Sequence, residues 1–264
     1  MNTRPLISLV FVNYRSVWQL SSALRGLFEK EKDFSSFEVI VVNNYESEGR
    51  VLCELAKKLP IVIQNRERND GYGTAANEGA RLAQGEIVGF LNPDVEWLSP
   101  LLGGVRDFYR LNGSGVLGLS LCDESGERER FAGGKAPSLL EIVKNKLWPQ
   151  RFRADSDVVV YDWVSGGAIF LKKSDFESLQ GFDEQFFLYF EDADLCVRAK
   201  MRGISIALDP SLQLKHKGGK SFRTVSEQKK HYYASQVRYF SKHRPFLEAV
   251  LLRFLHGFFQ IFRI

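Results

Sequence analysis

The fold is decided by residues 6–42, which read LISLVFVNYRSVWQLSSALRGLFEKEKDFSSFEVIVV. Residues 6–12 and residues 39–42 are almost entirely apolar. The apolar positions between these two runs follow helical spacing: Leu20, Leu24, Leu27 and Phe28. The stretch therefore predicts a strand, a helix and a second strand, with strands buried on both faces.

The same alternation continues along the chain. An amphipathic pattern over residues 51–59 precedes a short apolar run at residues 61–63, and a helix over residues 74–83 precedes a buried strand at residues 87–91. Buried strands that alternate with helices imply a parallel sheet with helices on each side. We therefore expect the α/β class, with a Rossmann-like, mostly parallel sheet flanked by helices.

The second half of the chain is less regular. Further strands are expected at residues 116–121, 158–161 and 168–171. Ser99-Pro100 predicts one helix start, and the capping box from Ser174 to Glu177 predicts another, whose helix stops at Gly181. Residues 122–157 lack a sustained period and predict a long loop or lid.

The overall composition suits one large α/β domain with an appendage, because 264 residues with 44% hydrophobic residues can bury a substantial core. Three distant cysteines, Cys53, Cys122 and Cys196, match no disulfide framework or zinc spacing and predict a reducing cytoplasm. The apolar run at residues 6–12 is too short for a signal sequence. No stretch reaches the ~18 apolar residues of a spanning helix, so neither export nor membrane crossing is expected.

Charge is divided unevenly between the body and the tail. Residues 217–264 hold ten Lys or Arg and two acidic residues, whereas residues 1–216 hold 26 basic and 30 acidic residues. A tail of net charge +8 on a body of −4 suits either nucleic acid or an anionic membrane.

The tail also carries an apolar stripe. From Pro245 onward, residues at i, i+3, i+4 spacing are apolar: Leu247, Val250, Leu251, Phe254, Leu255, Phe258, Phe259 and Phe262. Together with the basic residues just upstream, this favours an interfacial helix at the inner face of the cell membrane. A helix packed on the body, or an oligomer contact such as a homodimer, is the alternative. Nucleic acid is not expected, because no stacking platform accompanies the charge.

Polar motifs follow three of the predicted strands, at the sheet edge where α/β proteins bind ligands. Asn43-Asn44-Tyr45 offers amides that can pair with a nucleobase, or is an Asn-rich turn. Residues 69–79, NDGYGTAANEG, permit close backbone approach and an anion at a helix N-terminus, or only tight helix packing. Asn92-Pro93-Asp94 offers a carboxylate for Mg²⁺ or Mn²⁺, although Asp is also a common turn former.

An acidic motif stands further along the chain. Glu191-Asp192-Ala193-Asp194 follows the aromatic residues 186–190 and opens a helix that ends near Gly203. Three carboxylates there complement the helix dipole, but an apolar flank also raises a carboxylate pKa toward that of a general base. His216 follows a strand-like segment and is either a metal ligand or a structural histidine.

These motifs, in this order, resemble the inverting GT-A glycosyltransferases of family 2, particularly bacterial O-antigen rhamnosyltransferases. The resemblance rests on VVNN, NDGYGTAANEG, FLNPDV, WVSGGAIFLKKSDFESLQGFDEQFFLYFEDADLCVRAKMRG and HKGGKS, and it covers about residues 6–223. It implies a GT-A domain over residues 1–223, with a nucleotide-binding half (1–121) and an acceptor half (122–223), and a basic amphipathic helical tail over residues 224–264.

The resemblance also implies roles for individual residues. Those expected to bind the nucleotide donor are Asn13, Asn43, Asn69, Gly71, Tyr72, Asn77, Asn92 and Asp94. Those expected to shape the acceptor and sugar pocket are Trp163, Ser165, Gly166, Gly167 and Glu191. Asp192 is expected to be the catalytic base, and Asp94 and His216 to be metal ligands for Mg²⁺ or Mn²⁺.

Two positions depart from the family pattern. Asn43 stands where the family usually has an Asp that contacts the base, and Asn-Pro-Asp carries one acid where many relatives have two. The implied reaction is the inverting transfer of a sugar, with dTDP-L-rhamnose as the expected donor and UDP- or GDP-sugars as alternatives. The expected acceptor is a lipid-linked saccharide in cell-surface polysaccharide synthesis. A non-catalytic nucleotide-sugar-binding protein of the same fold is the other hypothesis, but it predicts loss of Asp192, Asp94 or His216, which are all present.

Overall fold

The structure is a computed structural model that describes residues 5–129, 132–147, 158–217 and 225–262. The first half of the chain alternates strands and helices as predicted. Its elements are β1 (Ile7–Asn13), α1 (Val17–Lys30), β2 (Phe37–Asn43), the 3₁₀ helix η1 (Glu46–Glu48), α2 (Gly49–Ala56), β3 (Ile61–Asn65), α3 (Tyr72–Leu82), β4 (Ile87–Leu91), β5 (Val95–Trp97), α4 (Leu102–Asn112) and β6 (Val116–Cys122).

The second half adds short strands and three long helices. Its elements are β7 (Gly133–Gly134), α5 (Leu139–Leu147), β8 (Val159–Val160), β9 (Trp163–Val164), β10 (Ala168–Lys172), α6 (Lys173–Ser178), α7 (Glu191–Met201), β11 (Ile206–His216), α8 (Val225–His243) and α9 (Phe246–Phe262).

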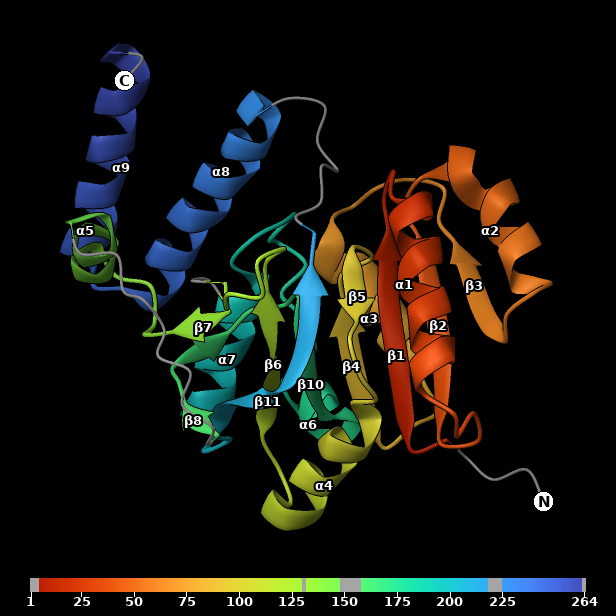
Figure 1. The fold of residues 1–264 in the computed structure, drawn as a ribbon. Helices are drawn as coiled ribbons and strands as arrows, with labels where there is room; N and C mark the ends of the chain where they lie inside the picture. Colours follow the sequence, from red (N-terminus) through yellow and green to blue (C-terminus); the bar gives the residue numbers. More distant parts are fainter. Residues whose placement is uncertain (1–4, 130–131, 148–157, 218–224, 263–264) are drawn as a thin grey trace.

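The central sheet has the strand order β3-β2-β1-β4-β10-β6-β11-β5, and β8 pairs with β11 (Figure 1). Strands β3, β2, β1 and β4 are parallel, whereas β10 runs antiparallel between β4 and β6. Strand β11 is parallel to β6 and antiparallel to β5. The α/β class with a helix-flanked sheet is thus confirmed, and the sheet is parallel mainly in the half that carries the asparagine motifs.

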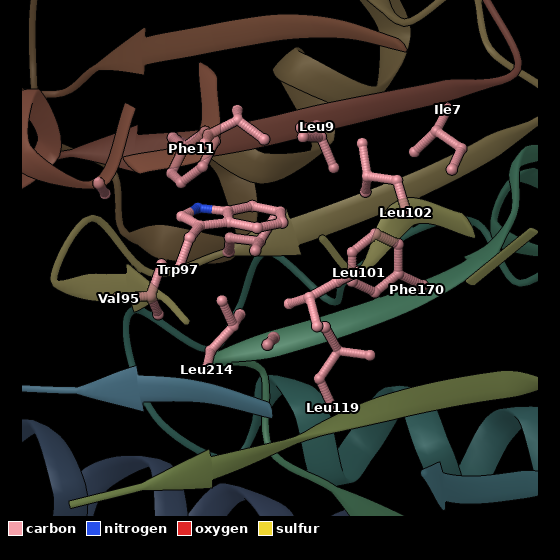
Figure 2. Close-up of a cluster of buried hydrophobic side chains, with 14 of the residues drawn as sticks. Ile7, Leu9, Phe11, Val95, Trp97, Leu101, Leu102, Leu119, Phe170 and Leu214 are labelled. Carbon is pink, nitrogen blue, oxygen red and sulfur yellow. The ribbon is translucent and has the colours of Figure 1, made fainter. Parts of the chain in front are cut away.

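Both faces of the sheet are covered by packed side chains. On the α1 face, the Trp97 indole lies among Phe11, Leu9 and Leu214 (Figure 2). On the opposite face, a second buried cluster joins residues of α3 and α7 with Phe90 of β4 and with Phe182, which follows α6. Burial of each large apolar side chain contributes about 1.5–3 kcal/mol, so this double-sided core holds the strand ends in place.

Helix α3 lies unusually close to the sheet because its inner face is made of glycine and alanine. A Cβ added at Gly79 would lie 2.4 Å from Val10 Cγ1, and Ala75, Ala76 and Ala80 are buried beside it. The small residues of the 69–79 motif therefore do serve tight helix packing, as the structural alternative proposed. The first turn of α3 nevertheless faces the site described below.

Two predicted helix starts were wrong. Helix α4 begins at Leu102 and not at Ser99-Pro100, because the Glu31 carboxylate at the end of α1 accepts hydrogen bonds from the backbone N–H of Leu101 (2.5 Å) and Leu102 (2.9 Å). Helix α6 begins at Lys173 without a side-chain cap, so the expected capping box from Ser174 does not form. A tertiary contact replaced the local cap in the first case.

The predicted loop over residues 122–157 is also more ordered than expected. Its described part contains β7, which pairs with β9, and helix α5, while residues 130–131 and 148–157 lie outside the described residues. Helix α5 is amphipathic and packs Leu139 and Ile142 against the C-terminal helices.

Helices α8 and α9 pack on the body next to α7 and α5 (Figure 1). Their shared core joins Tyr239 and Phe240 of α8, Leu252 of α9 and Phe186 just before α7. None of the described helices has both the length and the hydropathy of a membrane-spanning segment.

Candidate active site

Three asparagines stand side by side where β1, β2 and β3 end. Asn13 is in register with Asn43, and Asn43 with Asn65. The Asn13 amide donates to Asn43 Oδ1 (2.9 Å), and the Asn43 amide donates to Asn65 Oδ1 (2.9 Å). Because Asn43 Oδ1 also accepts from the Tyr45 backbone N–H (3.2 Å), its amide is engaged in a buried network that ties the strand ends together.

The neighbouring residue, Asn44, faces the cavity instead. Its Nδ2 donates to Asn69 Oδ1 (3.3 Å) and to the Gly71 carbonyl (3.1 Å), which fixes the orientation of the amide. Its Oδ1 is buried and has no hydrogen-bond partner among the described residues. A buried acceptor without a partner is costly, so Asn44 offers a ready contact for an N–H group of a ligand.

The turn from Asn69 to Tyr72 forms one wall of the cavity. Asn69 Oδ1 accepts from the Gly71 N–H (3.0 Å), and the Tyr72 N–H donates to the Phe187 carbonyl (2.8 Å). Gly71 has φ +101°, and a Cβ there would lie 2.4 Å from Phe187 O. Only glycine permits this conformation together with this approach.

Asp94, which follows β4, lies next to His216, the last residue of β11. The distance from His216 Nε2 to Asp94 Oδ1 is 3.2 Å, and that from His216 Nδ1 to Glu129 Oε1 is 2.9 Å. Burial by itself would lower the pKa of His216, but the hydrogen bonds with Asp94 and Glu129 outweigh it and raise this pKa to about 10. Asn92 Nδ2 lies 3.4 Å from His216 Nε2 and completes the cluster.

The chemistry of this cluster fits a divalent metal only in part. Among the described residues, no group of three His, Cys, Asp or Glu side chains is arranged to hold an ion by itself. Asp94 Oδ1 is a suitable donor on one side of the cavity, and His216 Nε2 becomes one when a metal displaces its proton. Mg²⁺ or Mn²⁺ commonly takes its other ligands from substrate phosphates and water. The pair is therefore a half-site that a diphosphate would complete.

Asp192 lies at the start of α7, where its carboxylate is held by backbone N–H groups. Gly166 N donates to Oδ2 (2.8 Å), and Ala193 N donates to Oδ1 (2.7 Å). Burial raises the pKa of Asp192 above its usual value and outweighs these hydrogen bonds. A carboxylate that is oriented by backbone N–H donors and has a raised pKa suits a general base.

Glu191 precedes Asp192 and is only 6% exposed. Burial, followed by the charge of Asp192, raises the pKa of Glu191 well above its usual range, and its Oε2 has no partner among the described residues. Two adjacent carboxyl groups do not both ionise easily. Because Glu191 is buried whereas Asp192 is half-buried, the raised pKa favours the neutral form of Glu191.

The cavity has a volume of about 370 Å³. The predicted site residues that line it are Asn69, Gly71, Tyr72, Asn92, Asp94 and His216. Asn44 and Pro93, which also line the cavity, belong to two of the predicted motifs. The sequence assigned no role to the other lining residues, which are Val12, Tyr14, Ser16, Phe187, Leu188, Tyr189 and Gln228. The turn signal at Asn43-Asn44 and the aromatic run 186–190 were visible in the sequence, whereas nothing local marked Gln228.

Other predicted residues lie behind the cavity wall. Asn13 and Asn43 belong to the strand-end network, and Asn77 binds the backbone of Phe182 through both ends of its amide (2.9 and 2.8 Å). Trp163, Ser165, Gly166, Gly167, Glu191 and Asp192 are also outside the lining of the cavity. Tyr72 connects the two regions, because it lines the cavity and its hydroxyl lies 3.5 Å from the Gly166 carbonyl.

A comparison with family models matches residues 8–194 to the model described as glycosyl transferase family 2. The chain belongs to glycosyl transferase family 2. The matched region contains the asparagine motifs, Asp94 and Asp192. His216 and helix α8 lie beyond it.

Two characterised relatives in this glycosyltransferase family bear names that specify rhamnose. The chain is 27% identical over 207 residues to the N-acetylglucosaminyl-diphospho-decaprenol L-rhamnosyltransferase of Mycobacterium tuberculosis, covering 67% of this chain and 66% of that protein. It is 30% identical over 196 residues to the rhamnosyltransferase WbbL of Escherichia coli, covering 70% of this chain and 74% of that protein. The chain thus spans just under two thirds of the mycobacterial relative's length.

Solved structures share the GT-A fold. The mannosyltransferase PcManGT from Pyrobaculum calidifontis, in complex with GDP-Man and Mn²⁺, superposes with a TM-score of 0.64 at 18% identity and covers 91% of this chain and 64% of that chain. Residues 1–349 of S. aureus TarS give a TM-score of 0.58 at 17% identity, covering 89% of this chain and 72% of that chain. At these identities the likeness concerns the fold of the glycosyltransferase domain.

Proposed function

We propose that this protein transfers a sugar from a nucleotide donor to an acceptor hydroxyl with inversion at the anomeric carbon, and that Asp192 is the general base. The observation that carries this proposal is the arrangement at one sheet edge. The Asn44 amide and the Asp94–His216 pair line one cavity. Asp192 lies next to this cavity and is connected to it through Gly166, whose N–H binds Asp192 and whose carbonyl lies 3.5 Å from the hydroxyl of the lining residue Tyr72.

The nucleobase is assigned to Asn44 and not to Asn43. The free Oδ1 of Asn44 accepts an N–H from uracil, thymine or guanine, whereas cytosine and adenine present an acceptor at the corresponding ring nitrogen. Asn69 holds the Asn44 amide in place. This favours dTDP-, UDP- and GDP-sugars over CDP- and ADP-sugars.

The diphosphate is assigned to the half-site formed by Asp94 and His216. A divalent metal bound there would neutralise the charge that develops on the leaving nucleoside diphosphate. A mixed oxygen and imidazole pair suits Mn²⁺ better than Mg²⁺. Glu129, hydrogen-bonded to His216 Nδ1, holds the imidazole so that Nε2 faces the cavity.

In the reaction, Asp192 takes the proton from the acceptor hydroxyl as its oxygen attacks the anomeric carbon. The bond to the diphosphate breaks on the opposite face, so the configuration inverts. The N–H groups of Gly166 and Ala193 keep the Asp192 carboxylate in one orientation, and its partial exposure leaves it open to an acceptor hydroxyl.

The donor and acceptor classes are proposed from the relatives. The names of both relatives specify rhamnose, and the name of the mycobacterial relative also specifies the L configuration and an N-acetylglucosaminyl-diphospho-decaprenol acceptor. These names support L-rhamnose as the transferred sugar, for which dTDP-L-rhamnose is the proposed donor. We therefore propose a lipid-linked saccharide acceptor and a place in the synthesis of a cell-surface polysaccharide such as O-antigen, at the cytoplasmic face of the membrane.

Contact with that membrane is proposed through helices α5 and α9 together. Large apolar side chains are exposed on both: Leu140, Val143 and Leu147 of α5, and Phe246, Leu247, Val250, Leu251 and Phe254 of α9. The two helices are joined by a hydrogen bond from the Leu139 N–H to Glu248 Oε1 (2.6 Å). Lys144 and Arg253 add positive charge among these residues.

Vesicle flotation tests the membrane contact in the full chain. Removal of α9 would open the core at Leu252, so substitutions on its exposed face are preferable. Leu247→Asp with Val250→Asp should reduce binding to anionic vesicles by about tenfold or more, whereas the control Leu111→Asp, at a residue 78% exposed on α4, should not. If the double variant floats as well as the Leu111→Asp control, the membrane contact is refuted. If the double variant instead changes its oligomeric state, the exposed face of α9 is a homodimer contact.

Thermal stabilisation across a donor series tests the proposed function most broadly. The unfolding temperature should rise with dTDP-, UDP- or GDP-sugars and rise further with Mn²⁺, because ligands that bind only the folded state stabilise it. CDP- and ADP-sugars should have little effect. If the protein binds the donor but neither hydrolyses it nor transfers its sugar, it is instead a nucleotide-sugar-binding protein.

A further inference from the structure

The turn that precedes Asp192 has an unusual backbone conformation. Tyr189 and Phe190 are both left-handed, with φ of +69° and +66°, and neither is glycine. Non-glycine residues rarely adopt this conformation, and consecutive pairs persist only where surrounding contacts impose them. Phe190 is also the residue from which α7 starts, so the turn determines where Asp192 points.

Helix α8 supplies contacts that hold this turn. Ser235 Oγ donates to the Leu188 carbonyl (2.7 Å), and Gln228 Nε2 donates to the Tyr189 hydroxyl (2.8 Å). The Phe190 ring packs against two tyrosines of α8, with centroid distances of 5.3 Å to Tyr232 and 5.5 Å to Tyr239. Helix α8 thus contacts the turn at its backbone, at the Tyr189 hydroxyl and at the Phe190 ring.

A second anchor lies at the far end of α8. Asp194, fully buried in the first turn of α7, is 2.6 Å from His243 Nε2 and 2.6 Å from Lys242 Nζ. Arg198 of α7 also donates to Asp194 (2.7 Å). The two anchors fix α7 from both sides of Asp192, because one precedes it by four residues and the other follows it by two.

We propose that α8 is a positioning element of the active site, and that Ser235 is the residue through which it sets the orientation of Asp192. This inference rests on the proposed role of Asp192 as the base. Ser235 touches neither the cavity nor the Asp192 carboxylate, so it acts through the Leu188 carbonyl. The region that positions the base therefore extends beyond the family match at residues 8–194 into a helix that the sequence assigned to a tail.

The test compares Ser235→Ala with Ser241→Ala in the full chain. Ser241 lies on the same helix, but its hydroxyl donates to the Val237 carbonyl within α8 (2.7 Å) and does not reach the turn. Tyr189→Phe is a second variant that breaks the Gln228 hydrogen bond and keeps the ring. The measurements are kcat and donor KM for donor hydrolysis, the unfolding temperature, and hydrogen exchange of the backbone amides at residues 187–192.

We expect Ser235→Ala to lower kcat about tenfold, as the loss of one positioning hydrogen bond does, with donor KM changed less than about threefold. Exchange at residues 187–192 should speed up in Ser235→Ala and in Tyr189→Phe, but not in Ser241→Ala. Wild-type kcat and unchanged exchange in Ser235→Ala would overturn the inference. An equal loss of kcat in Ser235→Ala and Ser241→Ala would also overturn it, because the loss would then come from a general disturbance of α8 and not from the hydrogen bond to Leu188.

Asp192→Asn is measured alongside, so that the two proposals can fail separately. If Asp192→Asn retains turnover, the proposed base is wrong. If Asp192→Asn is inactive while Ser235→Ala behaves as wild type in kcat and in exchange, only the positioning role of α8 is wrong.

Discussion

Gly71 gives the sharpest test of how the cavity wall is built. In Gly71→Ala the added Cβ would lie 2.4 Å from the Phe187 carbonyl oxygen and 2.8 Å from its Cα, and the residue has φ +101°. The backbone conformation costs about 1–3 kcal/mol for a non-glycine residue, and overpacking against main chain adds about 1–3 kcal/mol. The expected destabilisation is about 4 kcal/mol, or a fall of about 10 °C in the unfolding temperature.

Two other glycines separate the contributions to this loss. Gly113 has φ +72° and ψ −43°, but a Cβ there meets no atom within 4 Å, so Gly113→Ala should cost only the conformational strain of about 1–3 kcal/mol. Gly103, inside α4, has open space and no positive φ, so Gly103→Ala should stabilise the helix by about 0.5–1 kcal/mol.

Thermal or urea unfolding of the three variants is the assay, with binding of a nucleoside diphosphate measured in parallel. Gly71→Ala should also weaken that binding, because the turn must move away from Phe187. If Gly71→Ala is no less stable than Gly113→Ala, the close approach of the two segments is not as described. The same result would remove the reason given for glycine at this position.

Three further predictions concern charged groups. Replacement of Asp94 by Asn or of His216 by Ala should each weaken Mn²⁺ binding in the presence of nucleoside diphosphate by about tenfold or more, measured by calorimetry, and undiminished binding in both variants would remove the half-site. Burial opposes ionisation of Asp194, but hydrogen bonds from His243, Arg198 and Lys242 lower its pKa to about 2. Because the folded-state pKa lies below the unfolded value, the charged Asp194 should contribute about 2 kcal/mol to the free energy of unfolding above pH ~5, and this contribution should be lost as the pH falls toward 2. Urea titrations of wild type and Asp194→Asn measure it as the difference in their stability. A difference that does not narrow over this pH range would contradict the prediction. The pKa of Glu191 is raised by burial and by the charge of Asp192, which favours the neutral form. Glu191→Gln should therefore be at least as stable as wild type at pH 8, and a loss of stability above about 2 kcal/mol would show that the fold needs the charged form.

Much of the fold was predictable because it depends on local patterns. Buried apolar runs at residues 6–12, 39–42 and 87–91 became β1, β2 and β4, and the acidic motif at Glu191 does open a helix. The convergence of the motifs was predictable too, since parallel strands end at one edge of the sheet.

Other details depend on tertiary contacts that no local pattern indicates. Which of Asn43 and Asn44 faces the cavity turns on a single residue at the end of β2, and a shift of one residue exchanges the two sides. The cap of α4 comes from Glu31, about seventy residues earlier in the chain. Gln228 reaches the cavity from a helix whose sequence pattern indicates only charge and amphipathicity.

The central claim is that Asp192 performs an inverting transfer from a nucleotide sugar. It is tested most directly by NMR observation of the anomeric configuration of the product from the donor that stabilises the protein most, with wild type and Asp192→Asn compared at saturating donor and Mn²⁺. We expect a product of opposite configuration to the donor for wild type, and turnover at least 10³-fold lower for Asp192→Asn with donor binding preserved. A product of retained configuration, or near-normal turnover in Asp192→Asn, would contradict it.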